Sequence, residues 1–173
     1  MAISTPRLKL RLLNSNDWLF FKNLNQNQQI MQYVADIEDE QTLFSLFESR
    51  VTTRKKGQEG WLSFVIEMAD TNELVGLHGI KPVTQNECQA EIGFMLHPDF
   101  QGKGFALEAT QAVINFAFKN LKYEALHATV TAGNVASAKL LEKLGFIHKK
   151  TIESNYQING KWYDDLILVL EHD

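Results

Sequence analysis

The chain has 173 residues, a length that suits one domain with a sizeable core and is short for two. Hydrophobic residues make up 45% and charged residues 22%, and the formal net charge of -4 gives no global attraction to nucleic acid or anionic lipid. The single cysteine, Cys88, excludes an intramolecular disulfide and a cysteine-based zinc cluster, and the five histidines show no metal-ligand spacing.

Hydrophobic periodicity and turn residues divide the chain into strands and helices. The expected elements are, in chain order, a strand at 8–12, a helix from Trp18, a helix at 40–54, strands at 61–68, 74–80 and 89–96, a helix at 103–120, a strand at 126–131, a helix at 134–144, and strands at 146–158 and 162–171. This order predicts an α+β fold, in which one domain over residues 1–173 forms a mixed sheet with helices on its faces.

Several of these elements end at recognisable capping and turn residues. Asn16-Asp17 is expected to cap the helix that begins at Trp18, and the glycines within residues 57–60 are expected to end the second helix. Gly145 is expected to close the last helix, and Asn159-Gly160 to form the turn between the last two strands.

The most informative segment runs from Ile92 to Ala106, where a strand passes through a glycine-rich turn into a long helix. Gly102 and Gly104 let backbone N–H groups approach a ligand, and the first turn of a helix presents unpaired donors with partial positive charge. These features predict a phosphate or pyrophosphate site. The segment is neither a Walker A loop, which needs Lys-Ser/Thr after its second glycine, nor a dinucleotide fingerprint, which needs a small residue where the chain has Leu107.

This segment resembles the signature Gln/Arg-x-x-Gly-x-Gly/Ala of the GCN5-related N-acetyltransferase (GNAT) superfamily. The resemblance implies that the strand residues Phe94-Met95-Leu96 carry a bulge whose splayed backbone binds the pantetheine arm of coenzyme A. It also implies that the pyrophosphate binds the turn formed by Gln101, Gly102, Lys103, Gly104, Phe105 and Ala106.

Three other segments extend the resemblance to nearly the whole chain. Residues 134–146 resemble the family element Asn-x-x-Ser/Ala followed by Gly-Phe, in which the Asn134 side chain contacts pantetheine; Asn134 also suits a helix N-cap. The opening segment 5–11, Thr-Pro-Arg-Leu-Lys-Leu-Arg, and the closing segment 159–165 resemble the RimJ/RimL-like branch of the superfamily.

The resemblance implies an acetyl-CoA-dependent N-acetyltransferase with a twisted, mostly antiparallel sheet of about seven strands and about four helices. The expected acceptor is a protein N-terminus, as for ribosomal-protein acetyltransferases; a polyamine or other small amine and a non-catalytic acyl-CoA sensor stay open as alternatives. Members of the branch are often homodimers. No metal, membrane or direct nucleic-acid partner is expected, and the N-terminus lacks the apolar core of a signal peptide, so a cytoplasmic protein is expected.

In this family the amine attacks the thioester directly, which calls for a base and for a proton donor to the leaving thiolate. Glu91 is the expected base, because some members place their catalytic glutamate on this strand; a solvent-facing carboxylate and a base at His78 stay open. Many members carry a tyrosine where this chain has Leu141, so Ser137 or Tyr156 is expected to be the acid.

Other polar groups have plainer interpretations. Cys88 lies in a polar loop without a neighbouring base and is not expected to be a nucleophile. The acidic run at 36–40 is expected to be a solvated loop. A second set of residues is expected to lie mostly in the core, with some at the acceptor cleft: Trp18, Phe20, Phe21, Phe44, Phe47 and Trp61. A solvated helix end, rather than a nucleic-acid site, is expected for the basic group Arg50, Arg54, Lys55 and Lys56.

Overall fold

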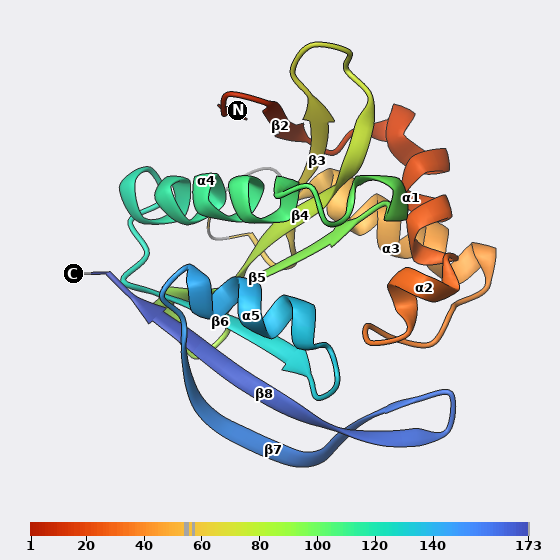
Figure 1. Ribbon diagram of the computed structural model, residues 1–173. Coiled ribbons are helices and arrows are strands. Elements are labelled where there is room, and N and C mark those ends of the chain that lie inside the picture. Colours follow the sequence, from red (N-terminus) through yellow and green to blue (C-terminus); the bar gives the residue numbers. More distant parts are fainter. Residues whose placement is uncertain (54–55, 57, 173) are drawn as a thin grey trace.

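The computed structural model describes residues 1–53, 56 and 58–172 (Figure 1). Its strands are β1 (Ala2–Ser4), β2 (Leu8–Leu12), β3 (Leu62–Met68), β4 (Leu74–Val83), β5 (Asn86–Leu96), β6 (Ala125–Thr131), β7 (Ile147–Ile158) and β8 (Lys161–Glu171). Its α-helices are α1 (Trp18–Asn25), α2 (Gln28–Met31), α3 (Glu40–Thr52), α4 (Phe105–Lys119) and α5 (Val135–Lys143). No helix in these described ranges is both long and apolar enough to cross a bilayer.

The strands form one sheet in the order β1-β2-β3-β4-β5-β6-β8-β7. Only β5 and β6 run parallel, because α4 connects them as a crossover, and the other neighbours are antiparallel (Figure 1). The predicted α+β fold with a mostly antiparallel sheet is therefore confirmed. The strand β1 and the helix α2 were not predicted, because elements of three and four residues are too short to show a period.

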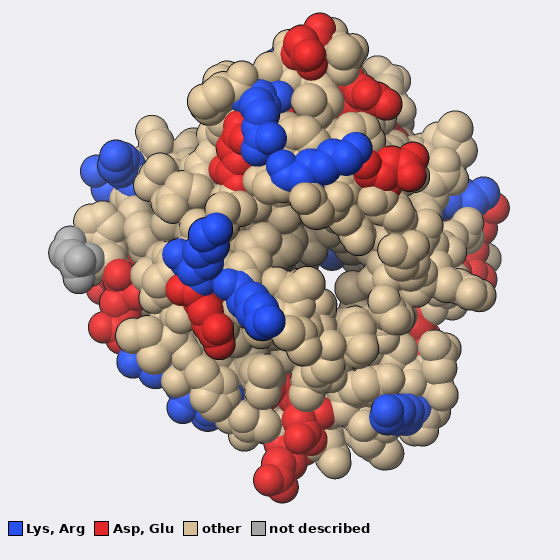
Figure 2. Space-filling view, in the orientation of Figure 1, with Lys and Arg blue, Asp and Glu red and all other residues tan. Residues whose placement is uncertain are grey.

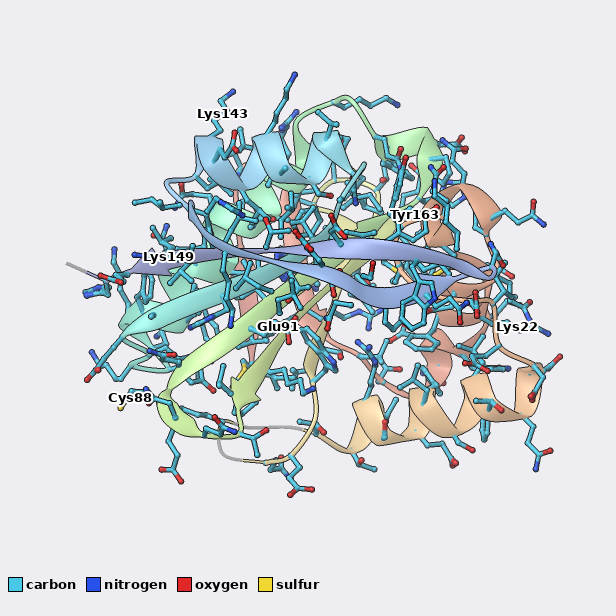
Figure 3. All side chains as sticks on the ribbon, turned by 90° about the horizontal axis from the view of Figure 1, so that it is seen from below. Lys22, Cys88, Glu91, Lys143, Lys149 and Tyr163 are labelled. Carbon is cyan, nitrogen blue, oxygen red and sulfur yellow. The ribbon has the colours of Figure 1, made fainter. Side chains whose placement is uncertain are left out.

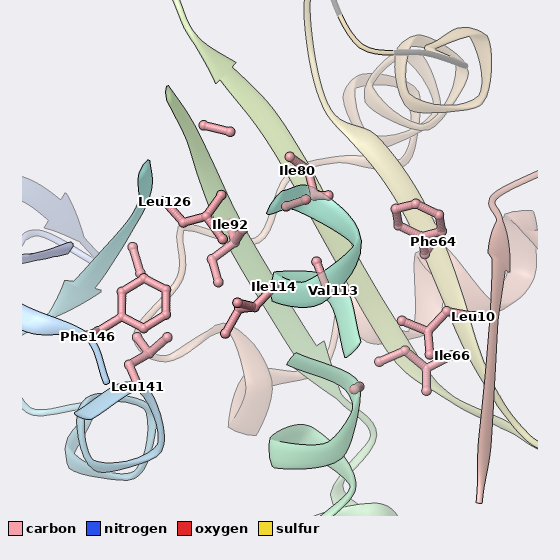
Figure 4. Close-up of a cluster of buried hydrophobic side chains, with 14 of the residues drawn as sticks. Leu10, Phe64, Ile66, Ile80, Ile92, Val113, Ile114, Leu126, Leu141 and Phe146 are labelled. Atoms are coloured by element: carbon pink, nitrogen blue, oxygen red, sulfur yellow. The ribbon is translucent and has the colours of Figure 1, made fainter. Parts of the chain in front are cut away.

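Helices cover both faces of the sheet and bury two separate apolar cores. Figure 4 shows the first core, where α4 and α5 meet the sheet through Leu10, Phe64, Ile66, Ile80, Ile92, Val113, Ile114, Leu126, Leu141 and Phe146. The second core joins α1–α3 to the opposite face through Leu13, Phe21, Leu24, Ile30, Met31, Leu43, Phe47, Val65 and Leu77. Each fully buried side chain of this size contributes about 1.5–3 kcal/mol, so the two cores hold the middle of the sheet rigidly.

The start of α1 differs from the expectation that Asn16-Asp17 caps it. Asn14 caps the preceding turn, since its side chain accepts a hydrogen bond from the Asn16 N–H, while its own N–H donates to Asp17. Asp17 is buried and receives two hydrogen bonds of 2.8 Å from Arg11, which also donates to Glu67 at 2.6 Å. The bond to Asp17 raises the pKa of Arg11, despite partial burial. The carboxylate of Asp17 therefore pairs with a charge instead of capping α1.

The turn predicted between the last two strands is confirmed. Asn159 and Gly160 have φ angles of 49° and 77°, as a tight two-residue hairpin turn requires. The Asn159 N–H donates to the carboxylate of Asp36 at 2.6 Å, so the tip of the hairpin contacts the loop that follows α2. Gly57, expected to help end the second helix, lies outside the described residues.

Candidate active site

The parallel strands β5 and β6 separate halfway along the sheet. They pair from Gln89↔Ala125 to Glu91↔His127 and then diverge, with the N-terminal ends of α4 and α5 on either side of the gap (Figure 1). A cavity of about 370 Å³ opens at this gap, seen as the deep hollow in Figure 2. The predicted site residues that line the cavity are Glu91, Phe94, Met95, Asn134, Ser137 and Tyr156.

The separation opens one backbone edge of β5 to the cavity. Beyond Glu91, β5 pairs only with β4, in continuous register from Lys81↔Glu91 to Gly76↔Leu96. The N–H and C=O groups on the other edge can bind an extended ligand as an added strand would. The prediction of a bulge at residues 94–96 is wrong, because the register shift between β4 and β5 lies at Pro82/Val83. Divergence from β6, and not a bulge, opens the edge.

The glycine-rich turn at residues 101–106 lies outside the cavity, at the N-terminal end of α4. Gly102 and Gly104 have φ angles of +73° and +80°, a region that side chains other than glycine rarely adopt. Within the described chain, the backbone N–H groups of residues 102–107 donate to no acceptor. Leu96 is buried beside the turn, and its carbonyl accepts a hydrogen bond of 3.0 Å from the Gln101 side chain. The Gln101 side chain therefore ties the turn to the end of β5.

Residues of the opening motif brace this turn from the side. Arg7 donates to Glu108 of α4 at 2.6 Å and to the Lys103 carbonyl at 3.1 Å, and its guanidinium lies 4.5 Å from the centre of the Phe105 ring. Thr5 donates a 2.6 Å hydrogen bond to the same carboxylate. Burial alone would raise the pKa of Glu108, but the bonds from Thr5 and Arg7 outweigh it and lower that pKa. The N-terminal segment thus holds the first turn of α4 in place.

The N-terminal end of α5 supplies polar groups from the other side of the cavity. The Asn134 side chain accepts a hydrogen bond of 3.4 Å from the Ser137 N–H, so the expected N-cap is confirmed. Its side-chain N–H groups have no partner in the described chain, and the residue lines the cavity. Ser137 also lines the cavity, next to the buried side chain of Leu141. Leu141 cannot donate a proton, whereas the Ser137 hydroxyl can.

Glu91 lies where β5 and β6 part, and Tyr156 faces the same cavity from β7. Figure 3 shows Glu91 near the middle of the sheet, whereas Cys88 lies at its edge, exposed and outside the cavity. Because side chains alternate along a strand, Glu91 shares the face of Gly93 and Met95, the face that α1–α3 cover. Glu91 therefore lines the cavity at the point where the two strands part.

His78 lies on the opposite face of the sheet from Glu91, against α4. Its Nε2 is 3.2 Å from the Thr110 hydroxyl, its side chain is fully buried, and burial lowers the pKa of His78 to about 3. A histidine with so low a pKa has little tendency to take a proton from an amine at neutral pH. The arrangement favours a packing role over the alternative of a base at His78.

Burial of a neutral histidine makes the fold sensitive to mild acid. The unfolded chain protonates this group below its ordinary pKa of 6.5, and the folded chain only near 3, so stability is complete above pH 6.5 and falls as the pH decreases. Between pH 7.5 and 5 the loss should reach about 2 kcal/mol. This loss can be measured by urea unfolding at both pH values for the wild type and for His78→Gln, a variant that keeps an amide near Thr110. A stability difference independent of pH would contradict the assignment.

Arg50 is a cavity residue that was not recognised as a site residue in the sequence. Arg50 was interpreted as part of a solvated helix end, but it lines the cavity. The available signal was its spacing, since Leu43, Phe47 and Arg50 recur at i, i+4 and i+7 on the buried side of α3. Of the remaining basic group, Lys56 donates to the Leu121 carbonyl at 2.7 Å, and Arg54 and Lys55 lie outside the described residues.

The mixed sheet thus splits between its two parallel strands, with helix N-terminal ends on both sides of the opening. Residues 7–147 match the family model of the acetyltransferase (GNAT) domain, so the chain belongs to this family. It is 28% identical over 160 residues to the spermidine N(1)-acetyltransferase of Vibrio cholerae, covering 91% of this chain and 89% of that protein.

Solved structures share the fold. A spermidine N-acetyltransferase from Vibrio cholerae in complex with CoA and spermine has a TM-score of 0.85 at 25% identity, covering 96% of each chain. The ribosomal-protein-S5-alanine acetyltransferase from Vibrio fischeri has a TM-score of 0.80 at 20% identity, covering 100% of this chain and 97% of that one, a likeness of fold alone. The chain is therefore a GNAT N-acetyltransferase.

Proposed function

We propose that the chain binds acetyl-CoA at the gap between β5 and β6 and transfers its acetyl group to an α-amino group, such as a protein N-terminus. The observation that carries this proposal is a pair of neighbouring backbone stretches with groups open to a ligand. One is the edge of β5 that β6 leaves after Glu91, and the other is the set of free N–H groups of residues 102–107 at the start of α4. The edge suits the amides of pantetheine, and the helix end suits a pyrophosphate.

The residues around the gap can supply the base and the proton donor that direct transfer needs. The amine nitrogen attacks the thioester carbonyl, and Glu91 accepts the proton that the nitrogen loses, directly or through water. The carbon–sulfur bond then breaks, and Ser137 or Tyr156 donates a proton to the thiolate sulfur. An α-amino group, with a reference pKa near 8, asks less of the base than a lysine or polyamine amine near 10.4.

Three of the four carboxylates in the acidic run at 36–40 hold other parts of the chain. The carboxylate of Asp36 accepts the Asn159 N–H, and Glu40 pairs with Lys22 at 2.7 Å. Asp39 caps α3 by accepting from the Thr42 N–H, which lowers the pKa of Asp39. These contacts hold the loop and the hairpin tip. The bracing role of Thr5 and Arg7 supports placement in the RimJ/RimL-like branch.

An acceptor screen tests the proposal by measuring release of free coenzyme A. Peptides with free N-termini are expected to be turned over at least about tenfold faster, in kcat/KM, than spermidine or N-terminally blocked lysine peptides at pH 7.5, because more of the amine is neutral. Faster turnover of spermidine would contradict the α-amino acceptor and indicate a polyamine acceptor. Thermal stabilisation by acetyl-CoA without turnover of any amine would instead identify an acyl-CoA sensor.

A further inference from the structure

Arg50 places a positive charge in the cavity without an acidic partner. It lies in the last turn of α3, and its Nε atom is buried and donates no hydrogen bond. Among the described residues no carboxylate lies within ion-pair distance of its guanidinium. Burying an unpaired charge costs free energy. A cation at this position therefore indicates that a ligand supplies the negative charge that pairs with it.

Aromatic rings hold Arg50 in place without neutralising it. Its guanidinium lies 5.3 Å from the ring centre of Trp61 and 6.0 Å from that of Phe21. Trp61 fits over Gly79 and Gly93, which face each other on β4 and β5, and a Cβ at Gly79 would lie only 2.8 Å from the Trp61 ring. Two glycines therefore leave room for the tryptophan on which Arg50 rests. The stack fixes the direction of the guanidinium before any ligand binds.

The charge of Arg50 persists at neutral pH, beside two carboxylates in the same cavity that form no ion pair with it. Burial lowers the pKa of Arg50 to about 10, which still leaves it protonated at pH 7. The cavity contains two carboxylates, Glu91 and Asp165, of which Asp165 accepts a 2.8 Å hydrogen bond from Asn155 on β7. An incoming molecule thus meets a guanidinium with no acidic partner among the described residues and, in the same cavity, the carboxylate of Glu91. That pair of charges matches an acceptor with an amine and an anionic group.

We propose that Arg50 binds a carboxylate of the acceptor. The acceptor is then a residue with both a free α-amino group and a carboxylate, either a free amino acid or a peptide that begins with aspartate or glutamate. A polyamine, which carries only positive charge, is disfavoured at this site by Arg50. This inference rests on the proposed function and narrows its acceptor.

Matched acceptors and variants of Arg50 test the proposal. Peptides that begin with Asp or Asn, free aspartate and spermidine are compared by coenzyme A release with the wild type, Arg50→Lys and Arg50→Met. We expect the wild type to prefer the Asp peptide or free aspartate over the Asn peptide by about 10- to 100-fold in kcat/KM, the range of one charge-assisted hydrogen bond. Arg50→Met should abolish this preference through KM, and Arg50→Lys should retain part of it. The ratio of free aspartate to Asp peptide distinguishes the two sources of the carboxylate.

Lys81 provides the control for charge alone, since its Nζ lies 5.9 Å from the same Trp61 ring but outside the cavity. Lys81→Met should keep the preference for the carboxylate. The Tm of Arg50→Met should not fall, because an apolar side chain of similar length replaces an unpaired charge. Equal loss with every acceptor together with a lower Tm would make Arg50 a structural residue and overturn the proposal, as would a wild-type preference for spermidine or the Asn peptide. Failure of the proposed function would differ: no acceptor would release coenzyme A.

Discussion

Replacing Glu91 by glutamine is expected to lower kcat/KM by about 10²- to 10⁴-fold at pH 7, the usual contribution of a positioned general base. The substitution keeps the size and the hydrogen-bonding capacity of the side chain but removes the group that accepts the proton. The loss should shrink as the pH rises above 8, because an α-amino group then becomes neutral without help. Rates of coenzyme A release between pH 6 and 10 measure both effects.

Glu87 offers a matched control on the same strand. It is exposed and lies outside the cavity, so Glu87→Gln removes the same charge from β5 without touching the site. Its pH profile should follow that of the wild type. The affinity for acetyl-CoA should be unchanged in both variants, because the proposed contacts with pantetheine and pyrophosphate do not involve either side chain. If Glu91→Gln matched the wild type across the whole pH range, the base would have to be another group.

The fold could be predicted well from the sequence because its longer elements have clear periods. The strand β5 and the helix α4 were located within about three residues, since apolar spacing and the glycines between them mark both. The separation of β5 from β6 could not be predicted in this way. It depends on which residues of β6 find partners, and pairing partners leave no periodic signal in a single strand.

The site was predicted unevenly for a related reason. Glu91, Asn134 and Ser137 lie in or beside the segments that resemble the family, and the structure brings all three to one cavity. Arg50 lies in α3, where no motif marks it and where the neighbouring basic residues suggest a solvated surface. Only its position relative to Leu43 and Phe47 shows that it points inward. Cofactor contacts made by backbone follow from a motif, whereas acceptor contacts made by side chains depend on tertiary packing.

Replacing Gly104 by valine is expected to weaken the binding of acetyl-CoA by about 10- to 100-fold, corresponding to the loss of one or two hydrogen bonds to charged phosphate. Gly104 has a φ of +80° and directly precedes α4, so a β-branched residue must strain or reorient the turn that aims the free N–H groups of residues 102–107. Isothermal titration calorimetry with acetyl-CoA measures the change.

Gly160 separates backbone strain from loss of the cofactor site. It has a φ of +77°, and nothing lies within 4 Å of the position of an added Cβ, yet it belongs to the hairpin turn between β7 and β8. Gly160→Val should lower the free energy of unfolding by about 1–2 kcal/mol, as Gly104→Val should, because both variants place a side chain in the left-handed region. Only Gly104→Val should lose affinity for acetyl-CoA. Equal affinities in the two variants would show that the turn before α4 does not hold the pyrophosphate, whatever the family resemblance implies.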